Sequence, residues 1–148
     1  VVVSFPAENS TNGVLVLDAG DVNLTFKTYL QSPIRLTIKD DFVTDISGSG
    51  RDCEQLIRYL EAWEDRNAYA VSHVGWGVNP KARYEALSLY DKSDTNGTEL
   101  RCFAGNFLFS TGANEFAGRF TEGHFDLPML NCTIALDDEV VVDRGRVL

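Results

Sequence analysis

The chain has 148 residues, of which 44% are hydrophobic, so it is long enough for one domain with a substantial core. Its 13 basic and 22 acidic residues give a formal net charge of −9. This balance argues against a nucleic-acid partner and against an anionic membrane surface, because both call for basic patches. No apolar run is long enough to cross a membrane, and we expect no membrane partner.

Five segments at the start of the chain have the composition and alternation of β-strands. They are residues 1–5, 13–18, 22–28, 34–38 and 42–46. The near-continuous apolar run at 13–18 predicts a strand covered on both faces, whereas the alternation over 22–28 predicts a half-buried strand. Because Asp40 and Asp41 form a turn signal between the last two segments, we expect a β-hairpin there.

Residues 51–66 give the clearest helix pattern of the chain. Leu56, Ile57, Leu60 and Trp63 fall on one face, and charged residues fall on the other. A hairpin followed by an amphipathic helix is typical of a helix packed on an antiparallel sheet. We therefore predict an α+β fold with a mostly antiparallel β-sheet and one main helix at about 51–66.

The second half of the chain predicts further strands joined by glycine-rich loops. The strand regions are 69–77, 100–111, 130–136 and 140–143. Gly75 and Gly77 interrupt the first of them, which indicates a bulge or a close approach of another backbone. Gly105 is expected to bend the second. Residues 81–89 predict one or two helical turns, and residues 112–123 predict a loop.

The three cysteines, Cys53, Cys102 and Cys132, have no paired spacing. An odd number of unpaired cysteines is typical of a reducing compartment, so we expect a cytoplasmic protein. The absence of a Cys-x-x-Cys motif argues against a structural zinc site.

The most suggestive chemical motif is His124-Phe125-Asp126. In a strand, residues two apart point to the same face, so the imidazole and the carboxylate would lie side by side. The only other histidine is His73, and two histidines with one carboxylate are the ligand set of many non-haem iron(II) sites. The alternative is an ordinary buried histidine beside a turn or capping aspartate, because short motifs often match by chance.

Glycines and polar residues gather in three places: 72–80, 105–112 and 118–126. Both histidines lie in these places, which strengthens the hypothesis of one convergent site. A Ser/His/Asp triad could also be assembled from Ser110, His124 and Asp126. However, the chain has no Gly-x-Ser-x-Gly motif, and a histidine and an aspartate two residues apart are more typical of co-ligands.

These same segments resemble a known enzyme family. The stretches Ser72–Pro80, Gly105–Gly112 and Gly118–Met129 are similar to the 2,5-dihydroxypyridine 5,6-dioxygenases of bacterial nicotinic-acid and nicotine breakdown. That family is related in fold to the aminopeptidase T (M29-type) metallopeptidases. The resemblance covers most of the chain and corresponds to the family's C-terminal, metal-carrying half. It implies that residues 1–148 form a single metal-binding catalytic domain, the C-terminal part of a longer two-domain protein whose N-terminal domain is missing here.

The resemblance implies a ring-cleaving dioxygenase with one iron(II) held by His73, Ser110, His124 and Asp126. His73, His124 and Asp126 would form the catalytic centre, and the partners would be O2 and a small aromatic diol. The aminopeptidase relatives instead need two metal ions, such as zinc or cobalt, and the combination of His73 with Ser110 favours the dioxygenase branch. A dinuclear leucyl aminopeptidase and a non-catalytic relative of the fold remain the alternatives.

Three further residues are candidates for substrate binding. Glu8 follows Phe5-Pro6-Ala7 and resembles a family position that contacts substrate, although a substrate-binding histidine expected nearby is absent. Arg119 could pair with a substrate oxyanion, or could form an ordinary salt bridge. Trp76 could line an apolar pocket, or could belong to the core. We also expect a homo-oligomer, because the chain begins directly in a strand.

Overall fold

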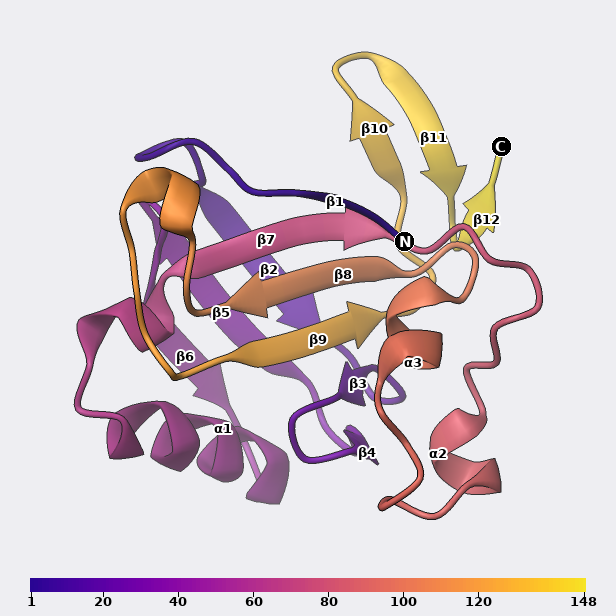
Figure 1. Ribbon diagram of the computed structural model, residues 1–148, viewed down its shortest axis with the longest axis horizontal. Helices are drawn as coiled ribbons and strands as arrows, with labels where there is room; N and C mark the ends of the chain where they lie inside the picture. The colour runs from indigo at the N-terminus through magenta and orange to yellow at the C-terminus, as the bar shows by residue number, and fades with distance from the viewer.

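The computed structural model describes residues 1–148 and has the predicted α+β class. Its front layer is an antiparallel sheet of four strands in the order β1-β7-β8-β9 (Figure 1). The strands are β1 (Val2–Ser4), β7 (Val71–Trp76), β8 (Phe107–Thr111) and β9 (Phe125–Met129). Each strand in this sheet runs antiparallel to its neighbours. The register of the last two strands pairs Ser110 of β8 with Asp126 of β9.

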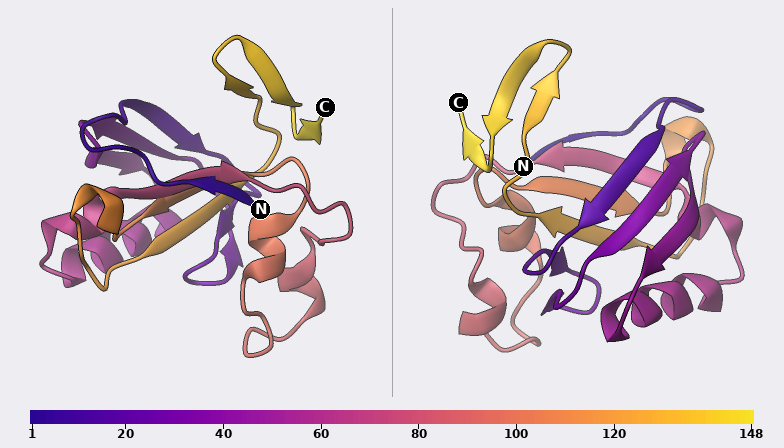
Figure 2. Two further views of the ribbon diagram at one scale, coloured as in Figure 1. Left: turned by 45° about the horizontal axis from the view of Figure 1, so that its top comes forward. Right: turned by 180° about the vertical axis from the view of Figure 1, so that it is seen from behind.

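A second antiparallel sheet lies behind the first, with the main helix beside it (Figure 2). Its strands are β2 (Gly13–Leu17), β5 (Ile34–Lys39) and β6 (Phe42–Gly48), and the helix is α1 (Arg51–Ala62). The principal core joins these layers, since Leu36 of β5, Leu56 of α1 and Phe109 of β8 belong to one buried apolar cluster. The predicted hairpin between β5 and β6 is confirmed.

Shorter elements surround the two sheets. They are β3 (Val22–Asn23), β4 (Thr28–Tyr29), α2 (Ala86–Leu89), α3 (Thr98–Cys102) and the 3-10 turns η1 (Arg66–Tyr69) and η2 (Glu115–Ala117). Val22, Ala86 and Leu100 form a second apolar cluster that fixes α2 and α3 beside β3. The strands β10 (Ile134–Leu136), β11 (Glu139–Asp143) and β12 (Arg146–Val147) form a small sheet that projects from the body in Figure 1.

The main helix ends earlier than the sequence predicts. It stops at Ala62 because Glu64 adopts a positive φ of 50°, which a right-handed helix cannot continue. The side chain of Asp65 then accepts a hydrogen bond from the Asn67 backbone at 2.9 Å and starts η1. Of the predicted apolar face, Leu56 and Leu60 are buried and Ile57 packs partly buried against the core, whereas Trp63 lies past the end of the helix and is 37% exposed.

Four strand predictions need correction. The segment 22–28 is a strand only at Val22–Asn23, because the Asn23 side chain accepts from the Phe26 backbone at 3.0 Å and closes a turn. Strand β2 is covered on one face only, since Val14 and Val16 are 49% and 48% exposed. The other two corrections concern boundaries.

The segment 100–111 begins as the helical turn α3 before it becomes β8, and the break falls where Gly105 has a φ of 85°. The predicted strand 130–136 is shortened to β10 (Ile134–Leu136), because Asn131 adopts a φ of 56° just after β9 ends.

The glycines of β7 are explained by packing against neighbouring backbone. A Cβ atom at Gly75 would overlap the carbonyl group of Val2 in β1, and one at Gly77 would overlap the carbonyl group of Phe103. The register of β7 on β8 also shifts, but between Val71 and Val74 and not at the glycines where a bulge was predicted. No helix of the structure is long and apolar enough to cross a membrane.

Candidate functional site

Three adjacent strands bring the predicted ligand residues onto one face of the front sheet. Ser110 of β8 lies directly opposite Asp126 of β9, and the irregular part of β7 places His73 beside Ser110. His124 immediately precedes β9. Because side chains alternate along β9, Phe125 points into the principal core while Asp126 points away from it.

Three of these side chains converge on one carboxylate oxygen of the fourth, Asp126. We refer to His73, Ser110, His124 and Asp126 as the strand-end cluster. Asp126 Oδ1 lies 3.3 Å from His124 Nε2 and 3.5 Å from His73 Nε2. Ser110 Oγ donates to the same Oδ1 and lies 3.0 Å from His73 Nε2. The two imidazole rings stack, with their centroids 5.7 Å apart.

The strand-end cluster is closed on the sheet side and open on the histidine side. Ser110 and Asp126 are buried, whereas the His124 side chain is 45% exposed and the His73 side chain is 14% exposed. The histidine side is therefore the side of the cluster that faces solvent.

Arg101 is a partner of the cluster that the sequence did not suggest. It extends from α3, and its Nε and Nη2 atoms lie 2.7 Å and 2.6 Å from Asp126 Oδ2. The two residues are 25 positions apart and belong to no common motif. The segment containing Arg101 also looked like a strand, so no sequence signal could have identified this contact.

The cluster perturbs the acid–base behaviour of its members. Burial would raise the pKa of Asp126, but hydrogen bonds from His124 and Ser110, with the charges of His124 and Arg101, hold it well below its ordinary value. Burial lowers the pKa of His73, Asp126 opposes this shift, and the charges of His124 and Arg101 add to it. The result is an ionised carboxylate beside a neutral imidazole.

A serine outside the predicted set determines which nitrogen of His73 carries hydrogen. The hydroxyl of Ser72 donates its one hydrogen to the Ala113 carbonyl at 2.6 Å. Its oxygen lies 3.2 Å from His73 Nδ1 and must therefore accept a hydrogen bond from it. His73 Nε2 consequently presents a lone pair to the cluster.

None of the predicted substrate residues forms a hydrogen bond or ion pair with the strand-end cluster. The Arg119 guanidinium is buried and binds Asp41 Oδ2 at 2.9 Å and the Val71 carbonyl at 3.2 Å. Trp76 pairs with Phe107 three residues beyond His73 along β7. Glu8 is exposed and forms no hydrogen bond or ion pair within the chain. Their roles toward a substrate stay predictions.

One aromatic side chain borders the cluster, and a second packs against the first. The Phe5 ring lies 5.5 Å from the His73 ring and 5.4 Å from the Phe116 ring, measured between centroids. Phe5 is 43% exposed and Phe116 is 85% exposed. Neither was predicted as a site residue, and Phe5 adds exposed apolar surface next to His73.

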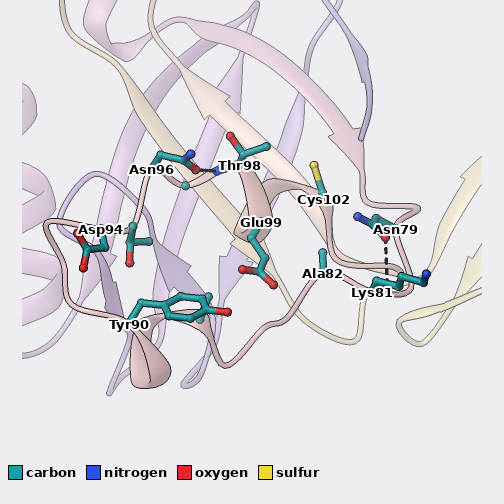
Figure 3. A pocket seen from close by; sticks show the side chains of 12 residues that line it. Asn79, Lys81, Ala82, Tyr90, Asp94, Asn96, Thr98, Glu99 and Cys102 are labelled. Atoms are coloured by element: carbon teal, nitrogen blue, oxygen red, sulfur yellow. Dashed lines mark hydrogen bonds between the residues drawn. The ribbon is translucent and has the colours of Figure 1, made fainter.

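A cavity lies elsewhere in the chain. It has a volume of about 420 Å³ and lies between α2 and α3, where Tyr90, Glu99 and Cys102 contribute to its wall (Figure 3). None of its lining residues belongs to the strand-end cluster. Because convergent titratable groups indicate a reactive site better than volume does, we take the cluster as the candidate site.

Comparisons with known proteins agree on one family. The family model for NicX, 2,5-dihydroxypyridine 5,6-dioxygenase, matches residues 1–148. A 2,5-dihydroxypyridine 5,6-dioxygenase of Pseudomonas putida KT2440 is 44% identical over 147 residues, which are 98% of this chain and 42% of the relative. The solved structure of 2,5-dihydroxypyridine dioxygenase from Pseudomonas putida KT2440 superposes with a TM-score of 0.94 at 44% identity, covering 99% of this chain and 42% of that one. The chain thus spans less than half the length of the relatives it matches.

Proposed function

Because the chain belongs to the 2,5-dihydroxypyridine 5,6-dioxygenase family, we propose that it is the metal-carrying part of a ring-cleaving dioxygenase. Its substrates would be O2 and a dihydroxypyridine, the diol named for its relative. Residues 1–148 would form one catalytic domain of a longer protein. The observation that carries the proposal is the convergence of two imidazole nitrogens and a hydroxyl on one carboxylate oxygen.

The placement of hydrogens on Ser110 and His73 suits a bound divalent metal ion at the strand-end cluster. The hydroxyl of Ser110 donates to Asp126, so its remaining lone pairs face His73 Nε2 at 3.0 Å. Because Ser72 binds the Nδ1 hydrogen of His73, no hydrogen is available for Nε2. The lone pairs of Ser110 Oγ and His73 Nε2 therefore face each other with no hydrogen between them, and a cation would satisfy both.

The chemistry of the donors points to iron(II). His73, Ser110, His124 and Asp126 would hold the ion, and two histidines with one carboxylate are typical of iron(II) oxygenases. No group of three or more His, Cys, Asp or Glu side chains is arranged to enclose a metal ion. The fit therefore rests on the pairwise distances of 3.0–3.5 Å, which suit neighbouring ligands of one ion. When bound, iron(II) would orient the diol and O2 and pass electron density between them.

The protein's own residues contribute orientation, charge and exclusion of water. Ser72 keeps the Nδ1 hydrogen of His73 pointing away from the cluster, so that Nε2 stays available. Burial of Asp126 keeps water from its carboxylate, while Ser110 and Arg101 occupy its oxygens. Phe5 packs against the His73 ring, and the exposed Phe116 packs against Phe5 and would offer an apolar face to a planar ring.

The proposal is tested with the full-length protein reconstituted anaerobically with iron(II). Loss of dihydroxypyridine absorbance should follow the admission of O2, and His124→Ala should abolish it. The matched control is Asp143→Asn, which removes a carboxylate that lies beside the exposed Arg144. Undiminished turnover in His124→Ala would refute the ligand assignment. Hydrolysis of a leucyl peptide by the wild-type protein would instead favour the aminopeptidase alternative.

A further inference from the structure

The two oxygens of the Asp126 carboxylate have different surroundings. Oδ1 faces His73, His124 and Ser110. Oδ2 faces the opposite way and is held by Arg101 alone, at 2.7 Å from Nε and 2.6 Å from Nη2. One carboxylate oxygen therefore contacts the rest of the cluster, and the other contacts only the guanidinium of Arg101.

Arg101 is presented by a short element that is anchored on both sides. The neighbouring Leu100 is fully buried in the second apolar cluster, and its carbonyl accepts from Asn106 Nδ2 at 3.3 Å. The backbone N–H of Arg101 donates to the Gly97 carbonyl at 3.1 Å. A Cβ atom at Gly97 would lie 3.1 Å from Arg101 Nη1, so the absence of a side chain there leaves room for the guanidinium.

We propose that Arg101 is a positioning residue that restricts Asp126 to binding a metal ion through Oδ1 only. This inference rests on the proposed function, since it requires a metal ion at the strand-end cluster. Carboxylates bind metal ions through one oxygen or through both. By occupying Oδ2, Arg101 prevents the second mode and leaves one coordination position for a substrate.

The charge of Arg101 has a second consequence. A guanidinium on the far side of the carboxylate opposes a divalent cation and draws negative charge away from Oδ1. The wild-type site therefore binds its metal ion less tightly than the same four ligands would without Arg101. Because both N–H groups of Arg101 contact the same oxygen, a single ammonium group could perform the same role.

The experiment compares cobalt(II) binding by the full-length wild-type protein with that of Arg101→Met and Arg101→Lys. Methionine keeps the apolar stem without the charge, and lysine keeps a cation that can bind Oδ2. We expect Arg101→Met to bind cobalt(II) about tenfold more tightly, with weaker d–d absorption because the freed Oδ2 raises the coordination number. We expect Arg101→Lys to retain the wild-type absorption.

Arg83→Met is the matched control, because it removes an exposed arginine that pairs only with Glu85 and should change neither quantity. Circular dichroism of the metal-free variants checks that each one is folded. An Arg101→Met spectrum and affinity equal to the wild type would overturn the inference, as would an Arg101→Lys variant indistinguishable from Arg101→Met. A wild-type protein that binds no cobalt(II) would refute the metal site itself, and the two failures are thus distinct.

Discussion

Substitution of Arg119 distinguishes most clearly between a structural role and a substrate-binding role for that residue. Its guanidinium is buried and donates to Asp41, which is fully buried and also accepts backbone hydrogen bonds from Asn9 at 2.6 Å and Thr11 at 2.7 Å. Replacing Arg119 with methionine leaves this carboxylate without its cation. Removing one partner of a buried ion pair costs about 3–5 kcal/mol.

The lower end of that range applies, because Arg119 Nε has no hydrogen-bond partner and the wild-type pair is already incompletely compensated. We therefore expect Arg119→Met to lower the free energy of unfolding by about 3 kcal/mol, which for a domain of this size is about 10 °C in Tm. Thermal and urea unfolding measure this change. The control is Arg144→Met, whose exposed side chain lies beside Asp143 on the surface. An unchanged Tm together with an increased KM would refute the structural assignment and restore the substrate role.

The same pair predicts a dependence of stability on pH. Burial would raise the pKa of Asp41, but hydrogen bonds from Thr11, Arg119 and Asn9 and the charge of Arg119 hold it below its ordinary value. A carboxyl with a lowered folded-state pKa stabilises the protein above its unfolded pKa of about 3.9, and this stabilisation is lost as the pH falls further. Acid unfolding of the wild type should therefore be steeper below about pH 4 than that of Arg119→Met. Equal slopes would contradict the assigned pair.

Two further predictions concern the cluster. Ser72→Ala should weaken metal binding by about 10–100-fold with little change in Tm, because the Nδ1 hydrogen of His73 loses its acceptor. Ser72→Thr keeps a hydroxyl and should retain the affinity. Equal metal affinities in the two variants would exclude the orienting role of Ser72. Phe116→Ala should raise KM for dihydroxypyridine about threefold to tenfold and leave kcat unchanged, since a ring pair contributes about 0.5–1.5 kcal/mol. Phe120→Ala, which is also exposed but stacks on no ring, is the control, and matching KM values would contradict the prediction.

Local periodicity predicted the parts of this fold that depend on neighbouring residues. The hairpin of β5 and β6 and the buried face of α1 follow from residues two, three or four positions apart. The strand predictions failed where a side-chain hydrogen bond or a positive φ interrupts the strand. Asn23, for example, closes a turn within a segment whose apolar residues alternate regularly. The exposure of Val14 could not be predicted from β2 itself, because it depends on what lies across the sheet.

The candidate site shows the same division. A spacing of two residues was enough to place His124 beside Asp126, and both now lie within 3.3 Å through Nε2 and Oδ1. The approach of His73 depends on the shifted register between β7 and β8, which no local pattern encodes. His73 entered the predicted set as the only other histidine of the chain, and the family resemblance added Ser110 as a ligand.

Arg101 and Ser72 lay beyond both kinds of reasoning, and the cause is physical. The role of Ser72 depends on the direction of its hydroxyl hydrogen, which it donates to the Ala113 carbonyl. The role of Arg101 depends on which carboxylate oxygen it binds, namely Oδ2 of Asp126. Sequence spacing can bring residues to one face of a sheet, but it does not determine which lone pair remains free there. Since a metal ion binds lone pairs, the residues that orient the ligands decide whether four convergent side chains form a metal site with an open position or only a hydrogen-bonded cluster.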